Sequence, residues 1–178
     1  MNGNHKLYGK YRAMVLNNVD PMQQGRLQVQ APDVSGLLPS SWAMPCVPLA
    51  GMQTGSFAMP PIGSGVWVEF EQGELDRPIW VGCFWGSAAE IPALARTIPP
   101  GLSGIALQTV LQNGIVVSDL PGPTGGIMLK SAIGATIIVN DTGIYIQNGK
   151  GASLIMTGPT MAITAPTVTI NNGALVVV

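Results

Sequence analysis

The C-terminal half of the chain almost lacks charged and aromatic side chains, and this constrains the fold more than any other feature. Thirteen of the seventeen charged residues lie in 1–96, and none follows Lys150. Nine of the ten aromatic residues precede residue 86, which leaves only Tyr145. Short β-branched segments separated by glycine fill this half, and as lone strands they would expose flat apolar faces and open edges. The second half is therefore predicted to be an oligomeric β-structure that buries those faces against copies of itself or a partner.

The overall composition restricts the class of function. A length of 178 residues permits one domain or two small ones. The net charge is −1 without a basic patch, which argues against nucleic-acid binding driven by electrostatics. No unbroken apolar stretch of about 18 residues suggests a transmembrane helix. Residues 1–10 are polar and lack the apolar core of a signal peptide, so we expect synthesis in the cytoplasm.

Residues 7–85 have the pattern of a small all-β domain that follows a polar tail, residues 1–6. The predicted strands cover residues 7–17, 26–30, 41–48, 65–70 and 78–82. Pro45 and Pro48 cannot donate to a ladder, so the third strand is expected at an edge or bulge. Five short strands in about 80 residues fit a small closed barrel of the OB type.

After a linker at residues 86–103, residues 104–178 carry a soft repeat. Its nine candidate strands cover residues 104–110, 114–118, 126–131, 135–140, 143–147, 152–157, 160–164, 167–171 and 174–178. Aliphatic residues alternate with Thr, Asn, Gln and Ala, as in a β-solenoid or β-prism. Three chains winding around one axis would close the thin core and remove the edges. The side chains expected to point at that axis are Ile144, Ile146, Ile163, Val168 and Ile170.

Several stretches of the first domain resemble a known family. They lie at residues 10–21, 25–29, 42–48, 60–71 and 76–82. In this order they are similar to the OB domain of the central spike and baseplate assembly protein V family of contractile tails. Phage spikes, the VgrG spikes of type VI secretion and the spikes of extracellular contractile injection systems share this module. Residues 151–156 and 167–171 resemble the spike repeats of the family with lower specificity.

The resemblance implies a fold, a function and partners. It implies three OB domains in a ring below the tail hub and one C-terminal trimeric intertwined β-helix, which forms the needle that pierces a target envelope. The homotrimer would be assembled into a virion tail baseplate or injection particle, with baseplate wedge proteins as further candidate partners. The apolar C-terminus would expose strand edges at the tip, so a PAAR-type tip protein is expected there. Its predicted interface is Leu175, Val176, Val177 and Val178.

The sequence also departs from some relatives. Residues 86–103 leave no room for a lysozyme domain after the OB fold. An iron-binding tip needs His-x-His pairs, whereas the sole histidine is His5 in the polar tail. The large hub domains of VgrG are absent, so a separate hub protein is expected.

Other candidate sites have simpler explanations. The acidic residues Glu69, Glu71, Glu74 and Asp76 are expected in a solvated hairpin loop or in inter-subunit salt bridges to Arg77 or Arg26, rather than as a catalytic pair. The tryptophans Trp42, Trp67, Trp80 and Trp85 are expected in core or subunit packing rather than as base-stacking platforms. Gly63 and Gly65 fit a turn, and Cys46 and Cys83 fit buried thiols better than a disulfide or a metal pair. No catalytic residue, cofactor or metal is predicted.

Two other functions compete with that of a spike. One is an OB-fold module that binds carbohydrate or oligonucleotide on a β-stalk. That function favours a basic or ligand-lined barrel face, which the sequence does not indicate. The other is a polysaccharide-degrading tail enzyme, which needs carboxylate pairs on the β-helix. Residues 104–178 offer only Asp119 and Asp141 as carboxylate side chains.

Overall fold

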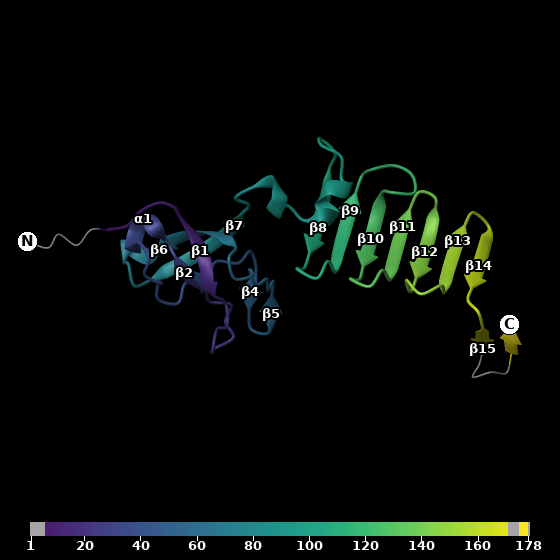
Figure 1. Cartoon of the computed structure of the whole chain (residues 1–178), viewed down its shortest axis with the longest axis horizontal. Helices are drawn as coiled ribbons and strands as arrows, with labels where there is room; N and C mark the ends of the chain where they lie inside the picture. Colours follow the sequence, from purple (N-terminus) through teal and green to yellow (C-terminus); the bar gives the residue numbers. More distant parts are fainter. Residues whose placement is uncertain (1–5, 171–174, 178) are drawn as a thin grey trace, which may run out of the picture. The chain divides into compact units, whose positions relative to one another are not determined.

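The structure, a computed structural model, describes residues 6–170 and 175–177 and consists of two compact units (Figure 1). Unit 1 spans Met1–Glu90 and unit 2 spans Ile91–Val178. Strands make up most of the regular structure in both units, so the predicted all-β class is confirmed. Among the described residues, no helix combines the length and the apolar character that crossing a membrane requires.

Unit 1 is built on one five-stranded sheet in the order β2-β1-β6-β7-β3. The strands are β1 (Tyr11–Asn17), β2 (Gln28–Gln30), β3 (Met44–Pro45), β6 (Gly65–Phe70) and β7 (Pro78–Phe84). All neighbours are antiparallel except β3 and β7, which are parallel. Strand β6 has the predicted bounds and the predicted alternation, because Val66, Val68 and Phe70 are buried.

Backbone pairing next to the two end strands curls this sheet into a small barrel. Leu27, just before β2, donates its N–H to the carbonyl of Ala43 over 3.1 Å, and Ala43 donates in return over 2.7 Å. Ala43 directly precedes β3 in the sequence, so the bridge joins the open ends of the sheet. The enclosed core consists of Ala13, Val15, Leu27, Val29, Ala31, Ala43, Val66, Val68, Phe70 and Trp80.

Local elements between the barrel strands differ from the predicted ones. The expected third strand at 41–48 shortens to β3, because Pro45 and Pro48 have no N–H to donate. A short helix α1 (Pro32–Ser35) and a small hairpin of β4 (Ala50–Gly51) and β5 (Thr54–Gly55) were not predicted. The acidic segment forms the connection between β6 and β7, as predicted, and contains the 3-10 turn η1 (Glu71–Gly73).

The two cysteines do not follow their predicted placement. Both Cys46 and Cys83 are exposed and unpaired, so the prediction of buried thiols is wrong. Cys46 directly follows the two-residue strand β3, and its N–H donates to the carbonyl of Trp80 in β7 over 3.0 Å. Cys83 lies beyond an irregularity in β7, where the register with β6 shifts between Trp67 and Val68. Such irregularities interrupt the regular alternation of faces on which the prediction depended.

Unit 2 contains a seven-stranded antiparallel sheet in which each strand pairs with the next along the chain. The strands are β8 (Gly104–Gln108), β9 (Gly114–Ser118), β10 (Gly126–Lys130), β11 (Thr136–Asn140), β12 (Gly143–Gln147), β13 (Ser153–Thr157) and β14 (Thr160–Thr164). Each lies within a predicted strand. Two-residue turns join β11 to β12 and β13 to β14, and loops of five to seven residues join the other neighbours. Gly158, between β13 and β14, has the left-handed φ of 52° that favours glycine. One chain therefore contributes a meander to the predicted trimeric β-helix.

Two further features of the chain lie outside this meander. The segment after the barrel forms the 3-10 turns η2 (Ala88–Glu90) and η3 (Ala93–Thr97). Beyond β14, strands β15 (Val168–Ile170) and β16 (Leu175–Val177) pair antiparallel with each other as a separate hairpin. Pro166 lies between β14 and β15 and has no N–H to continue the ladder.

Candidate functional site

The seven-stranded sheet of unit 2 collects large apolar side chains on one of its faces. Because side chains alternate along a strand, the strand register decides which residues share a face. On this side, called the apolar face, two rows cross all seven strands. One row contains Ile105, Val117, Ile127, Val139, Ile144, Met156 and Met161. The other contains Leu107, Ile115, Leu129, Ile137, Ile146, Leu154 and Ile163.

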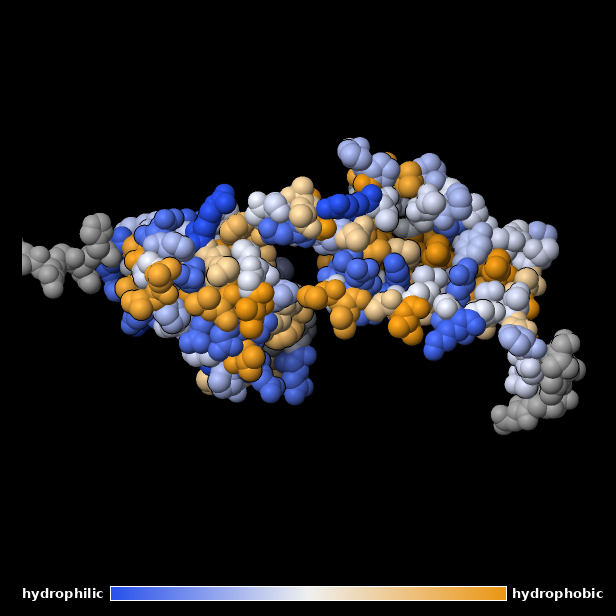
Figure 2. Space-filling model, in the orientation of Figure 1, coloured by the Kyte–Doolittle hydropathy of each residue, from blue (hydrophilic) through white to orange (hydrophobic). Residues whose placement is uncertain are grey.

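The apolar face lies largely open in the single chain. Ile105 and Leu107 each keep 63% of their surface exposed, and Ile163 keeps 52%. Hydrophobic surface is visible along the sheet in Figure 2. A continuous exposed surface of this kind marks an interaction site, because leaving it in water is unfavourable by roughly 25 cal/mol per Å².

The other side of the sheet, called the opposite face, has a different composition. A single central row is apolar or aromatic and consists of Ala106, Val116, Met128, Ile138, Tyr145, Ile155 and Ala162. The positions on both sides of it carry glycine or polar residues, among them Lys130, Asn140 and Gln147. This face therefore has a polar margin along much of its length, whereas the apolar face has none in its two rows.

The structure brings together three of the five predicted core residues. Ile144, Ile146 and Ile163 all lie on the apolar face, in rows that run through neighbouring strands. Val168 and Ile170 belong to β15, which lies outside the seven-stranded sheet. Their assignment to a trimer core stays a prediction, as does that of the other three.

Most members of the apolar face were not singled out from the sequence. The missed residues are Ile105, Leu107, Ile115, Val117, Ile127, Leu129, Ile137, Val139, Leu154, Met156 and Met161. The available signal was the same for all of them, namely two aliphatic residues separated by one position within a short strand. Strand register, which the sequence pattern alone does not supply, decides that all these pairs share one face.

Three of the four residues of the predicted tip interface belong to the terminal hairpin of β15 and β16. Leu175, Val176 and Val177 form β16, whose register places Leu175 opposite Ile170 and Val177 opposite Val168. Val178 lies outside the described residues, as does His5.

Three ion pairs join charged side chains within the described part of unit 1. Glu74 pairs with Lys6 and Glu69 pairs with Lys10. Arg26 pairs with Asp20, so it does not serve the acidic loop as expected. Among the residues that the structure describes, no group of three or more His, Cys, Asp or Glu side chains gathers as metal ligands would.

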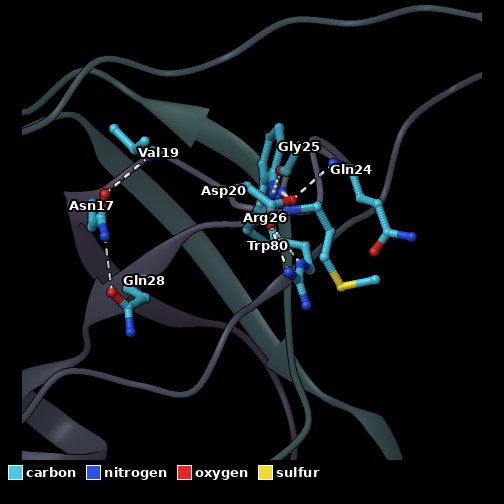
Figure 3. Close-up of polar contacts among 9 residues, drawn as sticks. Asn17, Val19, Asp20, Gln24, Gly25, Arg26, Gln28 and Trp80 are labelled. Atoms are coloured by element: carbon cyan, nitrogen blue, oxygen red, sulfur yellow. Dashed lines mark hydrogen bonds and ion pairs between the residues drawn. The ribbon is translucent and has the colours of Figure 1, made fainter.

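Asp20 organises the loop that leads into β2 (Figure 3). Its carboxylate accepts N–H groups of Met22, Gln24 and Arg26 at 3.0, 2.8 and 3.2 Å. The Arg26 guanidinium donates to it through Nε and Nη2 and also lies 5.4 Å from the ring centre of Trp42. The guanidinium, together with these backbone donors, holds the pKa of Asp20 well below its ordinary value. This buried carboxylate therefore fixes the loop in its folded state.

The tryptophans of unit 1 divide between core and surface. Trp80 is buried, and its indole N–H donates to the carbonyl of Gly25 over 3.0 Å. Trp67 packs against Phe84 with ring centres 4.9 Å apart, while 61% of Trp85 remains exposed. Packing in the barrel therefore accounts for Trp80 and Trp67.

A self-contained barrel and a sheet with one uncovered apolar face together define a structural protein that completes its core by association. Comparison with protein families agrees with this class. Residues 11–85 match the type VI secretion system/phage-baseplate injector OB domain, and residues 104–176 match the phage baseplate V C-terminal trimerisation domain. The chain belongs to the phage baseplate protein V family, with its OB and trimerisation domains in this order. A comparison with curated proteins found no match.

Membership of this family indicates the general role of the chain. It is a structural protein of a baseplate or spike, and its C-terminal domain supports self-association as a trimer. All residues of the apolar face lie within the matched trimerisation domain.

Proposed function

We propose that three copies of this chain form the central spike of a contractile injection machine. The trimer caps the tail tube beneath a separate hub protein and is driven through the target envelope when the sheath contracts. The apolar face is the observation that carries the proposal, because it gives each chain a surface that only further chains of the same shape complete. Three such sheets around one axis would turn all these rows inward and the polar margins of the opposite faces outward.

The sheet also has the construction expected of a stiff needle. Its strands are five residues long and each pairs with the next along the chain, so the backbone hydrogen bonds form a continuous ladder from β8 to β14. An interior filled with packed aliphatic side chains resists compression because protein cores are packed as densely as organic crystals.

The oligomeric state tests this proposal directly. We expect light scattering of the purified full chain at micromolar concentration to give three times the mass of one chain. A stable, folded monomer under these conditions would contradict the proposed assembly. Identifying the proteins that bind the trimer would show whether it belongs to a phage tail, a type VI-like apparatus or an extracellular particle.

The C-terminal residues are proposed as the binding site of a conical tip protein of the PAAR type. Deleting residues 175–178 removes β16 and leaves the seven-stranded sheet intact. The truncated chain is therefore expected to remain a trimer and to lose capture of its tip protein in a pull-down. Full capture by the truncated trimer would overturn this assignment, and its measured mass serves as the control for assembly.

An alternative function has one observation in its favour. Unit 1 contains a cavity of about 460 Å³ beside the β4–β5 hairpin, and its lining includes Gln24, Met44, Leu49, Phe57 and Trp80. This volume lies in the range of small-ligand sites. The polar and aromatic lining of the cavity suits a neutral carbohydrate, and no charged residue that would contact the phosphates of an oligonucleotide is among its lining residues. Calorimetric titration with oligosaccharides separates the two functions, because the spike requires no such binding.

A further inference from the structure

A short segment between the two matched domains folds back onto the seven-stranded sheet. This segment, called the strap, comprises residues 91–98 and contains η3. Leu94 is 5% exposed, and its backbone N–H donates to Oε1 of Gln108 in β8 over 2.9 Å. The strap is therefore anchored to unit 2 by a buried side chain and by a hydrogen bond.

The strap lies on the opposite face of β8 and β9. Gln108 belongs to that face, and so do Gly104 and Gly114, which back onto the strap. A Cβ on Gly114 would stand 2.3 Å from Cδ1 of Leu94, and a Cβ on Gly104 would stand 2.7 Å from Cδ1 of Ile98. The two glycines thus provide the space that the strap fills.

Burial differs sharply between the two faces of these strands. On the opposite face, Val116 is 4% exposed and Ser118 is 8% exposed. On the apolar face of the same strand, β9, Ile115 is 42% exposed and Val117 is 38% exposed. The strap therefore closes one side of β8 and β9 and leaves the other side open.

The strap covers a part of the opposite face where two glycines leave room for it. Each of β8, β9, β10 and β12 carries one glycine and one polar residue beside the central row. At β8 and β9 the polar residues are Gln108 and Ser118, and the strap packs against the glycines Gly104 and Gly114. Without a cover, Ala106 and Val116 would form a flat apolar surface there, which is the kind of surface that invites unintended association.

We propose that the strap makes the association of this chain one-sided. By sealing the opposite face of β8 and β9, Leu94 and Ile98 leave the apolar face as the surface through which copies can meet. At β8 and β9 the trimer then closes on itself, because the covered part of the second face cannot also bind a further chain. This inference rests on the proposed trimer and adds the element that limits assembly to it.

The test replaces Leu94 in the full chain and follows both the strap and the assembly. In Leu94→Ser, we expect trypsin to cut after Arg96 far faster than in the wild type, because the strap is released. Light scattering should then show particles of about twice the trimer mass or more, since open second faces allow trimers to associate. The control is Leu111→Ser, which changes a 73% exposed leucine in the β8–β9 turn and should leave both readouts unchanged.

Each result decides the proposal. Rapid cleavage after Arg96 with an unchanged trimer mass would overturn it, because a released strap would then have no effect on assembly. Slow cleavage with an unchanged mass would also overturn it, because Leu94 would not be the anchor. A monomeric wild type would instead refute the proposed trimer.

A second variant covers the case in which Leu94→Ser fails to fold. Gln108→Ala removes the acceptor of the Leu94 N–H and keeps the apolar anchor. It should increase both cleavage after Arg96 and the share of particles larger than a trimer. Gln147→Ala, a change at a flanking position of the same face in β12, is the matched control. Equal behaviour of the two glutamine variants would count against the strap.

Discussion

The two units of this chain solve the problem of burying apolar surface in different ways. Unit 1 closes a small barrel around ten buried residues, and the Asp20–Arg26 ion pair holds the loop that leads into β2. In the described part of unit 2, the buried hydrophobic residues are Leu94 and Val116, both associated with the strap. Unit 1 therefore has a core of its own, whereas unit 2 leaves its apolar face for the proposed association with other copies. The comparison teaches that a domain boundary can also separate intramolecular from intermolecular folding.

The largest expected effect comes from a charge on the apolar face. Ile163→Asp would bring three carboxylates together inside one trimer, and each uncompensated buried charge costs on the order of several kcal/mol. We expect loss of the trimer in light scattering. All four tryptophans lie in unit 1, so their fluorescence should still report a folded barrel. This outcome would show that unit 1 folds without the trimer.

Thr164→Asp is the matched control for this substitution. Thr164 neighbours Ile163 in β14 but belongs to the opposite face, so its charge should stay in water and assembly should persist. Equal tolerance of aspartate at the two positions would show that the faces are assigned wrongly.

A cavity created in the barrel should destabilise unit 1 and leave the trimer intact. Leu27 is fully buried, and Leu27→Ala is expected to lower the free energy of unfolding of unit 1 by about 2–5 kcal/mol. Urea unfolding followed by tryptophan fluorescence measures this loss, while light scattering should still give the trimer. Leu37→Ala, at a position that is 85% exposed, serves as the control. A variant that lost the trimer together with the barrel would break the proposed independence of the two units.

Acid should weaken unit 1 selectively, with a smaller effect. Because the pKa of Asp20 is lowered in the folded state, its stabilising contribution is complete above the unfolded pKa of about 3.9. It declines as the pH falls below about 4 toward the lower folded pKa. Urea midpoints of the wild type and Asp20→Asn should therefore differ at neutral pH and converge in acid. A constant difference across this pH range would rule out the carboxylate as the source.

Much of unit 2 was predictable because its signal is local. Each strand carries a two-residue alternation and ends at a glycine or a turn sequence, so the expected strands at 143–147 and 160–164 have their observed bounds. Alternation also indicates that Ile144 and Ile146 lie on one side of their strand, whereas the face that they share with Ile163 is fixed by the strand register. The strap was not predicted, because its position depends on packing against the glycines of β8 and β9. These glycines lie further along the chain, and the sequence of the strap itself, which contains Pro92, gives no sign of this contact.

Unit 1 was less fully predictable, because its loops depend on contacts across the barrel. The residues Asn18 to Pro21 are typical of a turn, but the pairing of Asp20 with Arg26 follows from the folded loop. The exposure of Cys83 depends on an irregularity between β6 and β7 that leaves no clear mark in the sequence. The hairpin of β4 and β5 is too short for a periodicity to be detected.

The meander of unit 2 has a consequence for how the protein folds. Every pairing from β8 to β14 joins strands that are consecutive in the chain, so the contact order within this sheet is low. Closing such short loops costs little entropy, and hairpins can form one after another as the chain leaves the ribosome. The ladder alone gains little burial, so its lasting stability awaits the meeting of three chains. The rate of maturation should therefore rise with chain concentration, and a dilute newly made chain should spend longest as an open sheet that is vulnerable to proteases.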